Sequence, residues 1–307
     1  MTGPRVPPPP VDGPSGYGWA KLILCGEHAV VYGHPGLALA LDRGTRATIT
    51  RRPGPTALAG GSPSDPRVNA GLAEILGVDG WAVHVRSDVP MGVGMGSSAA
   101  LAVAVARARL AYEGAPATPE RVFALAMQAE RAFHGNPSGI DQTVADRGGM
   151  VRFRRPPSGA PLEITPLPPP PWRVVVLETG TAGNTRALVE AVAARRPAID
   201  PLLDRIGALV DEAQRALRDP HTLGPLLDEN QRLLEGIGVS TPGIEALVAL
   251  ARGAGAFGAK LAGAGGGGVV LAICDDPAPI LAAADRAGAR AFEARVAPVR
   301  GEEDRHA

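Results

Sequence analysis

Four consecutive prolines, Pro168–Pro171, separate two halves of the sequence that have different local patterns. Proline cannot donate a backbone hydrogen bond, so such a run ends the preceding element and favours a boundary between two parts of a fold. Before it, apolar and alternating runs predict strands over 20–25, 36–42, 46–51 and 81–87, with helices over 97–114 and 119–133. After it, helical periods predict helices over 184–195, 201–217, 222–236 and 242–252, with strands over 173–177 and 269–274.

The expected fold class is therefore α+β, in two lobes. A chain of 307 residues is too long for one small core, and 45% apolar residues can fill two cores despite 40 glycines and 31 prolines. We expect a disordered proline-rich tail over residues 1–16, an N-terminal domain over 17–167 and a C-terminal domain over 172–307.

Charge and cysteine content exclude several classes of function. The 31 Lys and Arg balance 31 Asp and Glu, whereas a nucleic-acid-binding protein needs a basic excess to release counterions. Cys25 and Cys274 match neither a disulfide framework nor a metal-ligand spacing, so we expect both to be buried in a reducing compartment. The N-terminus lacks the apolar segment of a secretory signal, and no run is apolar enough for a membrane helix. The expectation is a soluble cytoplasmic protein.

A glycine-rich segment between a predicted strand and a predicted helix indicates an anion site. Alternating glycines let the backbone turn its amides inward, and a helix start offers unpaired N–H groups with a partial positive charge. Phosphate is the most natural ligand, and serine hydroxyls there can reach a phosphate-bound Mg²⁺. A tight turn before an ordinary helix is the alternative. The residues of the segment are Gly92, Gly94, Gly96, Ser97, Ser98 and Ala99.

Two other glycine clusters, at 253–258 and 263–268, satisfy the GxGxxG spacing but in a reversed context. A dinucleotide fingerprint must follow a strand and open a helix, whereas the first cluster follows a helix and the second leads into a strand. We therefore exclude dinucleotide-dependent hydride transfer. The second cluster still contains too much glycine for a regular element, which indicates that another strand or a ligand approaches its backbone closely.

Five further residues place charged or ionisable side chains where they need a partner. Glu130 falls on the apolar face of the helix over 119–133, and Asp141 follows a rigid turn near a helix start. Lys21 opens an otherwise apolar strand, with Glu27 and His28 in the turn at its far end. Taken singly, each residue has an ordinary alternative: a helix-end glutamate under an arginine, a helix cap, a lysine that protects a strand edge, and a turn histidine.

Together these segments resemble the kinase superfamily of galactose, homoserine, mevalonate and phosphomevalonate kinases, and most closely its mevalonate branch. Three motifs occur in order, namely KLILCGEHAVVYG, PMGVGMGSSAA and KLAGAGGGG. The stretches GEHAVVYG and HGNPSGID are the most discriminating. The similarity covers about residues 17–275.

The resemblance implies roles in phosphoryl transfer from ATP. Asp141 matches the catalytic aspartate, and Lys21 matches the lysine that pairs with it. Ser98 and Glu130 match ligands of Mg²⁺, while the glycine-rich segment matches the loop that holds the phosphates of ATP. The residues that match the acceptor side are Glu27, His28, Thr185, Gly265 and Gly266.

The implied fold has an N-terminal lobe similar to ribosomal protein S5 domain 2 and a ferredoxin-like C-terminal lobe, with ATP and the acceptor between them. The implied reaction is Mg²⁺-dependent phosphorylation of the 5-hydroxyl of mevalonate, a step in isoprenoid precursor synthesis. The sequence departs from the family pattern at Gly18-Trp19-Ala20, where Ala-Pro-Gly is usual, at Ala262 in place of Thr or Ser, and at Val269 in place of Cys.

Two alternative functions remain open from the residues alone. A sister kinase for phosphomevalonate or another small hydroxy acid would need more Lys or Arg around the acceptor. A non-catalytic ligand sensor on the same fold would have no need to keep both Lys21 and Asp141. We expect small-molecule partners, no nucleic acid and no membrane, and the sequence leaves open whether the chain forms a homodimer.

Overall fold

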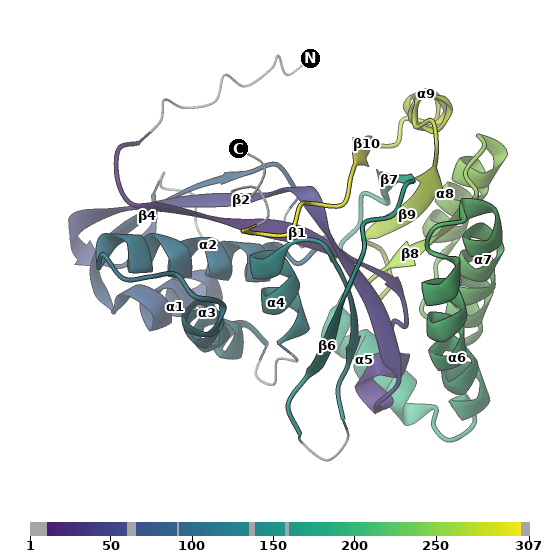
Figure 1. Cartoon of the computed structure of the whole chain (residues 1–307), viewed down its shortest axis with the longest axis horizontal. Helices are drawn as coiled ribbons and strands as arrows, with labels where there is room; N and C mark the ends of the chain where they lie inside the picture. The colour runs from purple at the N-terminus through teal and green to yellow at the C-terminus, as the bar shows by residue number, and fades with distance from the viewer. Residues whose placement is uncertain (1–10, 60–65, 91, 135–138, 157–159, 302–307) are drawn as a thin grey trace.

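The computed structural model describes residues 11–59, 66–90, 92–134, 139–156 and 160–301, and arranges them in two lobes, each built on one sheet (Figure 1). The elements of the N-terminal lobe are β1 (Ser15–Cys25), the 3₁₀ turn η1 (Ala29–Tyr32), β2 (Pro35–Pro55), β3 (Ala57–Leu58), α1 (Pro66–Leu76), β4 (Asp79–Ser87), α2 (Ser97–Tyr112), α3 (Pro119–His134), α4 (Ile140–Arg147), β5 (Met150–Arg154) and β6 (Glu163–Leu167). Those of the C-terminal lobe are β7 (Arg173–Glu178), α5 (Thr185–Ala194), α6 (Asp200–Ala216), α7 (Pro220–Gly236), α8 (Pro242–Gly253), β8 (Gly258–Ala262), β9 (Val269–Cys274), α9 (Ala278–Arg286) and β10 (Ala291–Ala294).

The first sheet is organised around the long strand β2. Its strand order is β3-β4-β2-β5-β6, and β1 pairs with β2 outside that path. The sequence predicts two separate strands over 36–42 and 46–51, but the chain between them stays extended because β1 pairs across it, with Trp19 opposite Gly44. The result is one strand that includes both predicted ranges.

Helix α2 packs directly on β1, and two glycines of β1 make this close contact feasible. A Cβ on Gly16 would lie 2.2 Å from the carbonyl oxygen of Ala104, and one on Gly18 would lie 2.2 Å from that of Ala100. Because α2 also contacts α1, α3 and α4, it is buried on nearly all sides. Its N-terminus is thereby fixed beside the strand that carries Lys21.

The second sheet is antiparallel, with the order β10-β7-β9-β8. Along the chain, the elements of this lobe follow one another as a strand, helices, two strands, a helix and a strand. This order is the split βαβ pattern of ferredoxin-like folds. The predicted α+β class and the ferredoxin-like second lobe are thus confirmed. The change of sheet falls across the proline run, since β6 ends at Leu167 and β7 begins at Arg173.

Beyond β10 the chain returns to the first lobe, as Figure 1 shows in yellow. Val296 forms a bridge with Leu41, and the Ala297 amide donates to the Ala40 carbonyl at 2.9 Å. At the other end, β1 already includes Ser15 and Gly16, while residues 1–10 of the expected tail lie outside the described residues. Within the part of the chain that the structure describes, no helix combines the length and apolarity needed to cross a membrane.

Candidate active site

Lys21 and Asp141 are 120 positions apart in the sequence and form an ion pair in the structure. The distance between Lys21 Nζ and Asp141 Oδ1 is 3.1 Å, and the side chains are 7% and 32% exposed. Lys21 lies in β1, and Asp141 lies in the first turn of α4, after the N-cap residue Gly139. The partial positive charge of a helix N-terminus favours a carboxylate there. One member of this pair is therefore enclosed, and the other remains accessible to a ligand.

The glycine-rich segment ends against this pair. The Lys21 amide donates to the Met95 carbonyl at 3.0 Å, and a Cβ on Gly96 would lie 2.8 Å from Lys21 Cγ. The φ values of Gly92, Gly94 and Gly96 are 78°, 83° and 67°, in the region that favours glycine. The described part of the loop thus brings the N-terminus of α2, with its free amides, next to Lys21.

The two serines at the start of α2 do not cap the helix. The N-cap is Gly96, whose left-handed backbone offers no side-chain acceptor. Ser97 Oγ instead accepts a 3.4 Å hydrogen bond from the Gly92 amide and so braces the loop, while Ser98 follows in the first turn. Ala99 is fully buried and anchors that turn in the core.

Glu130 of α3 is buried near the same pair. Burial, together with the charge of Asp141, raises its pKa to about 7, while a hydrogen bond with Gln142 and the charge of Lys21 oppose the rise. A buried carboxylate beside a second carboxylate is stabilised by a cation.

A metal at this site would need ligands beyond the protein. The described residues contain no cluster of three or more His, Cys, Asp or Glu side chains that could hold one. Mg²⁺, however, is usually bound by one or two carboxylates together with phosphate oxygens and water. The Glu130 carboxylate and the Ser98 hydroxyl have the donor chemistry for such a site, in which the nucleotide would supply the remaining oxygens.

Glu27 is placed differently from the expected acceptor-side residue. It is 1% exposed, and its Oε1 accepts from Lys260 Nζ of β8, which is fully buried. Burial raises the pKa of Glu27, and the Lys260 charge opposes the rise. The pair joins the turn after β1 to the second lobe, within a closed environment. In the sequence, Lys260 stands out only as part of the motif KLAGAGGGG, which does not indicate a partner for it.

His28 lies beside Glu27 and contacts the second lobe as well. Its Nε2 is 2.9 Å from the Ala264 carbonyl oxygen, and burial lowers its pKa. A carbonyl can only accept, so the neutral ring carries its proton on Nε2 and leaves Nδ1 as an acceptor. Its φ of 60° is unusual for a residue with a side chain and indicates that the contact holds the backbone there.

The glycine-rich tract between β8 and β9 packs closely against protein backbone from other segments, as its glycine content led us to expect of a strand or a ligand. A Cβ on Gly268 would lie 2.9 Å from the Val93 carbonyl oxygen of the phosphate loop. A Cβ on Gly265 would lie 2.1 Å from that of Val239, and the Gly266 amide donates to the same carbonyl. Gly265 and Gly266, expected at the acceptor, thus also serve to seat this tract.

Thr185, the remaining residue on the expected list, begins α5 and is exposed. Gly183, two residues earlier, lies against the tract, since its Cβ would be 2.2 Å from the Gly265 carbonyl oxygen. The structure therefore groups Lys21, Asp141 and Glu130 with the phosphate loop and places Thr185 at the edge of the neighbouring tract.

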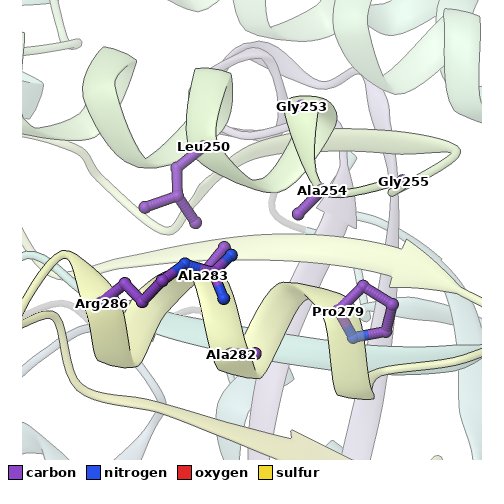
Figure 2. A pocket seen from close by; sticks show the side chains of 8 residues that line it. All are labelled: Leu250, Gly253, Ala254, Gly255, Pro279, Ala282, Ala283 and Arg286. Carbon is purple, nitrogen blue, oxygen red and sulfur yellow. The ribbon is translucent and has the colours of Figure 1, made fainter.

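One pocket of the described residues lies apart from these groups. It has a volume of about 650 Å³ and lies between α8 and α9 (Figure 2). Its lining residues are Leu250, Gly253, Ala254, Gly255, Pro279, Ala282, Ala283 and Arg286. None of the candidate site residues is among them, and Arg286 is the one charged side chain, so this groove offers no chemistry comparable to that of the Lys21–Asp141 pair.

Comparison with known proteins gives consistent matches over both lobes. Residues 67–149 match the model of the GHMP kinases N terminal domain, and residues 192–294 match that of the GHMP kinases C terminal domain. A mevalonate kinase of Thermococcus sibiricus is 34% identical over 298 residues, covering 84% of this chain and 88% of that protein. A mevalonate kinase of Thermococcus gammatolerans is 34% identical over 299 residues, with the same coverage.

The fold agrees with these sequence matches. A crystal structure of L. major mevalonate kinase in complex with R-mevalonate superposes with a TM-score of 0.81 at 28% identity, covering 94% of this chain and 97% of that one. Since both lobes match in sequence and nearly the whole chain matches in structure, the protein is a member of the GHMP kinase family.

Proposed function

We propose that this protein transfers the terminal phosphoryl group of ATP to the 5-hydroxyl of mevalonate, giving 5-phosphomevalonate and ADP. The observation that carries the proposal is the Lys21–Asp141 pair at 3.1 Å beside the N-terminus of α2. The relatives named mevalonate kinase support the choice of acceptor.

The roles follow from what phosphoryl transfer requires. Its transition state is loose, so catalysis consists mainly of positioning the reactants and stabilising charge. Asp141, the accessible member of the pair, would accept a hydrogen bond from the acceptor hydroxyl and orient its oxygen, or take its proton. Lys21 would hold Asp141 in place and face the negative charge that develops. The loop amides and the start of α2 would bind the phosphates of the nucleotide.

We further propose that the enzyme uses Mg²⁺, held by Glu130 and Ser98. When bound, the ion would neutralise charge on the phosphate oxygens. The raised pKa of Glu130, about 7, supports this role because a carboxyl group in that state gains from a nearby cation. Both cysteines are free and buried, which is consistent with a cytoplasmic, reducing location.

An acceptor panel tests the proposal. Purified protein is assayed for ADP release with ATP and Mg²⁺ against mevalonate, phosphomevalonate, galactose and homoserine. We expect mevalonate to give the highest kcat/KM. A clear preference for phosphomevalonate would assign the protein to the sister kinase instead, and ATP binding without turnover of any acceptor would favour a sensor.

A further inference from the structure

The last described residues of the chain, 295–301, form what we call the C-terminal strap. It follows β10, lies beyond the matched C-terminal domain, which ends at residue 294, and runs back along the first lobe (Figure 1). The Asp42 amide donates to the Arg295 carbonyl at 2.9 Å, and the Gly149 amide donates to the Ala297 carbonyl at 3.1 Å. The strap is thus held by backbone hydrogen bonds to β2 and to the turn after α4.

Arg300 of this strap joins the two elements that carry the ion pair. Its Nε donates to the Asp146 carbonyl at 2.8 Å, and its backbone amide donates to the Arg147 carbonyl at 2.8 Å. Both carbonyls belong to the last turn of α4, where the helix itself supplies no donors and a cation is favourable. Its Nη2 donates to the Tyr17 carbonyl at 3.0 Å, in β1. One guanidinium therefore bridges the strand of Lys21 and the helix of Asp141.

The side chain of Asp146 extends the connection to a third element. Its Oδ1 accepts from Nε and Nη2 of Arg107, both at 2.6 Å, and the Arg107 and Asp146 side chains are 15% and 9% exposed. Burial raises the pKa of Asp146, while the Arg107 charge opposes the rise. Arg107 belongs to α2, the helix that begins at the phosphate loop. The three elements that form the site are therefore joined at the ends that lie away from it.

Helix α4 depends on such anchors because it has only eight residues. A helix this short is not stable by itself, so its orientation depends on its packing against β1, α2 and α3 and on the contacts at its ends. Asp141 and Asp146 are five residues apart, little more than one turn, so a shift at the anchored end reaches the carboxylate of Asp141. Displacements of about 1 Å can lower turnover by up to about 100-fold.

We propose that Arg300 is a positioning residue for phosphoryl transfer, which acts by fixing α4 against β1 so that Asp141 meets Lys21. The proposal rests on the roles given above to Lys21 and Asp141. It assigns a function to a segment outside both matched domains and predicts an effect on kcat that passes through Asp141.

A double-mutant cycle tests it in the full-length protein. We expect Arg300→Ala to lower kcat by about 10-fold, with KM for ATP within about twofold of the wild-type value. Arg300→Lys keeps the charge but not the two-pronged geometry and should recover part of kcat. The matched control is Arg295→Ala on the same strap, whose side chain lies 3.8 Å from Glu293 and should leave kcat unchanged.

The decisive comparison is made in an Asp141→Asn background. If Arg300 acts through Asp141, adding Arg300→Ala there should change the residual kcat by less than about twofold. Equal losses in both backgrounds, or a normal kcat for Arg300→Ala, would overturn the proposal. If Arg300→Ala does not fold, the cycle is run with Arg300→Lys, and an unchanged kcat then overturns it. Normal turnover of Asp141→Asn alone would instead reject the proposed site.

Discussion

The protein contains two lysine–carboxylate pairs that are chemically alike and differ in access to solvent. Among 31 Lys and Arg residues, only Lys21 and Lys260 are lysines. In the pair of Lys21 with Asp141 the carboxylate is 32% exposed, whereas in the pair of Lys260 with Glu27 the side chains are 0% and 1% exposed. The carboxylate of the first pair is accessible to a substrate, whereas the second pair is enclosed.

The difference assigns the two pairs different tasks: the exposed pair is available for chemistry, and the enclosed pair joins the two lobes. A sealed ion pair carries a large desolvation cost and fixes one arrangement of its partners, in this case the turn after β1 against β8. The contact of His28 with Ala264 reinforces the same junction. Because the Glu27–Lys260 pair joins the lobes, the Lys21–Asp141 pair does not have to be enclosed, and Asp141 remains partly exposed.

The largest expected effect is on turnover through the open pair. Asp141→Asn should lower kcat by about 100-fold or more, the scale of a lost orienting or acid–base group, with little change in KM for ATP. Its effect on the free energy of unfolding should stay within about 1 kcal/mol, because Glu130 lies close enough to Lys21 to compensate. Steady-state kinetics and urea unfolding measure the two quantities, and near-normal turnover would remove Asp141 from the mechanism.

The sealed pair should show the opposite balance. Glu27→Gln leaves the Lys260 charge buried without a counterion and should cost about 3–5 kcal/mol of unfolding free energy. Replacing both residues, as Glu27→Gln with Lys260→Met, removes the buried charge and should recover most of that loss. Chemical unfolding of the three proteins decides the matter. A Glu27→Gln variant as stable as wild type would show that the pair does not hold the lobes together.

Proton and metal should compete at Glu130. Because its pKa is raised from 4.5 to about 7, the carboxyl group is ionised, and able to bind a cation, only as pH rises through that range. Apparent Mg²⁺ affinity should therefore increase by up to about tenfold per pH unit below pH 7 and level off above it. Glu130→Gln should flatten this profile and raise the Mg²⁺ requirement. A titration unchanged by the substitution would assign Glu130 a structural role.

The raised pKa of Glu130 also makes the free energy of unfolding depend on pH. Without ligands, the folded protein holds a proton on Glu130 that the unfolded chain releases, so this contribution is present below pH 4.5 and is lost as pH rises through about 7. Wild type should accordingly lose stability relative to Glu130→Gln across this window, as measured by thermal unfolding in buffers without Mg²⁺. A constant difference between the two proteins would contradict the raised pKa.

The smallest effect is expected at a departure from the family pattern. Ala262 is 3% exposed, and its carbonyl oxygen would lie 3.5 Å from a Cβ on Gly94 in the phosphate loop. Ala262→Ser restores a hydroxyl and should lower KM for ATP by about threefold, the value of one modest hydrogen bond. An unchanged KM would show that the hydroxyl has no phosphate within reach.

Local sequence patterns predicted the helices and strands better than the contacts between them. The long periodic helices α2, α3, α6, α7 and α8 were found within a few residues, since their apolar faces repeat over several turns. Other elements, namely α1, α4, β3, β5, β6, β8, α9 and β10, were given no residue range, although the sequence placed Asp141 near a helix start. Residues 140–147 show why: eight residues hold barely two turns, too few for a clear period, and the helix packs against the strap and α2, which lie far from it in the sequence.

At the candidate site, the sequence proposed residues but not all of their partners. Glycine spacing indicated the anion loop, and a charge in an apolar strand singled out Lys21. The acceptor-side role of Glu27 came from the family resemblance and stays a prediction, because a motif does not show that the carboxylate is enclosed with Lys260. The rarity of lysine was the available signal, because a chain that otherwise uses arginine keeps Lys260 in the middle of a buried strand.

By itself, then, the sequence predicted the α+β class and a boundary at Pro168–Pro171, and it indicated an anion loop and the charged residues of the candidate site, because helical and strand periods, proline runs, glycine spacing and charges are local features of a sequence. Only the tertiary structure decided that Lys21 meets Asp141, that Lys260 seals Glu27 across 233 positions and that Arg300 reaches Tyr17 across 283. Such contacts depend on how sheets and helices pack, and burial, not residue type, then decides which carboxylate remains available for chemistry.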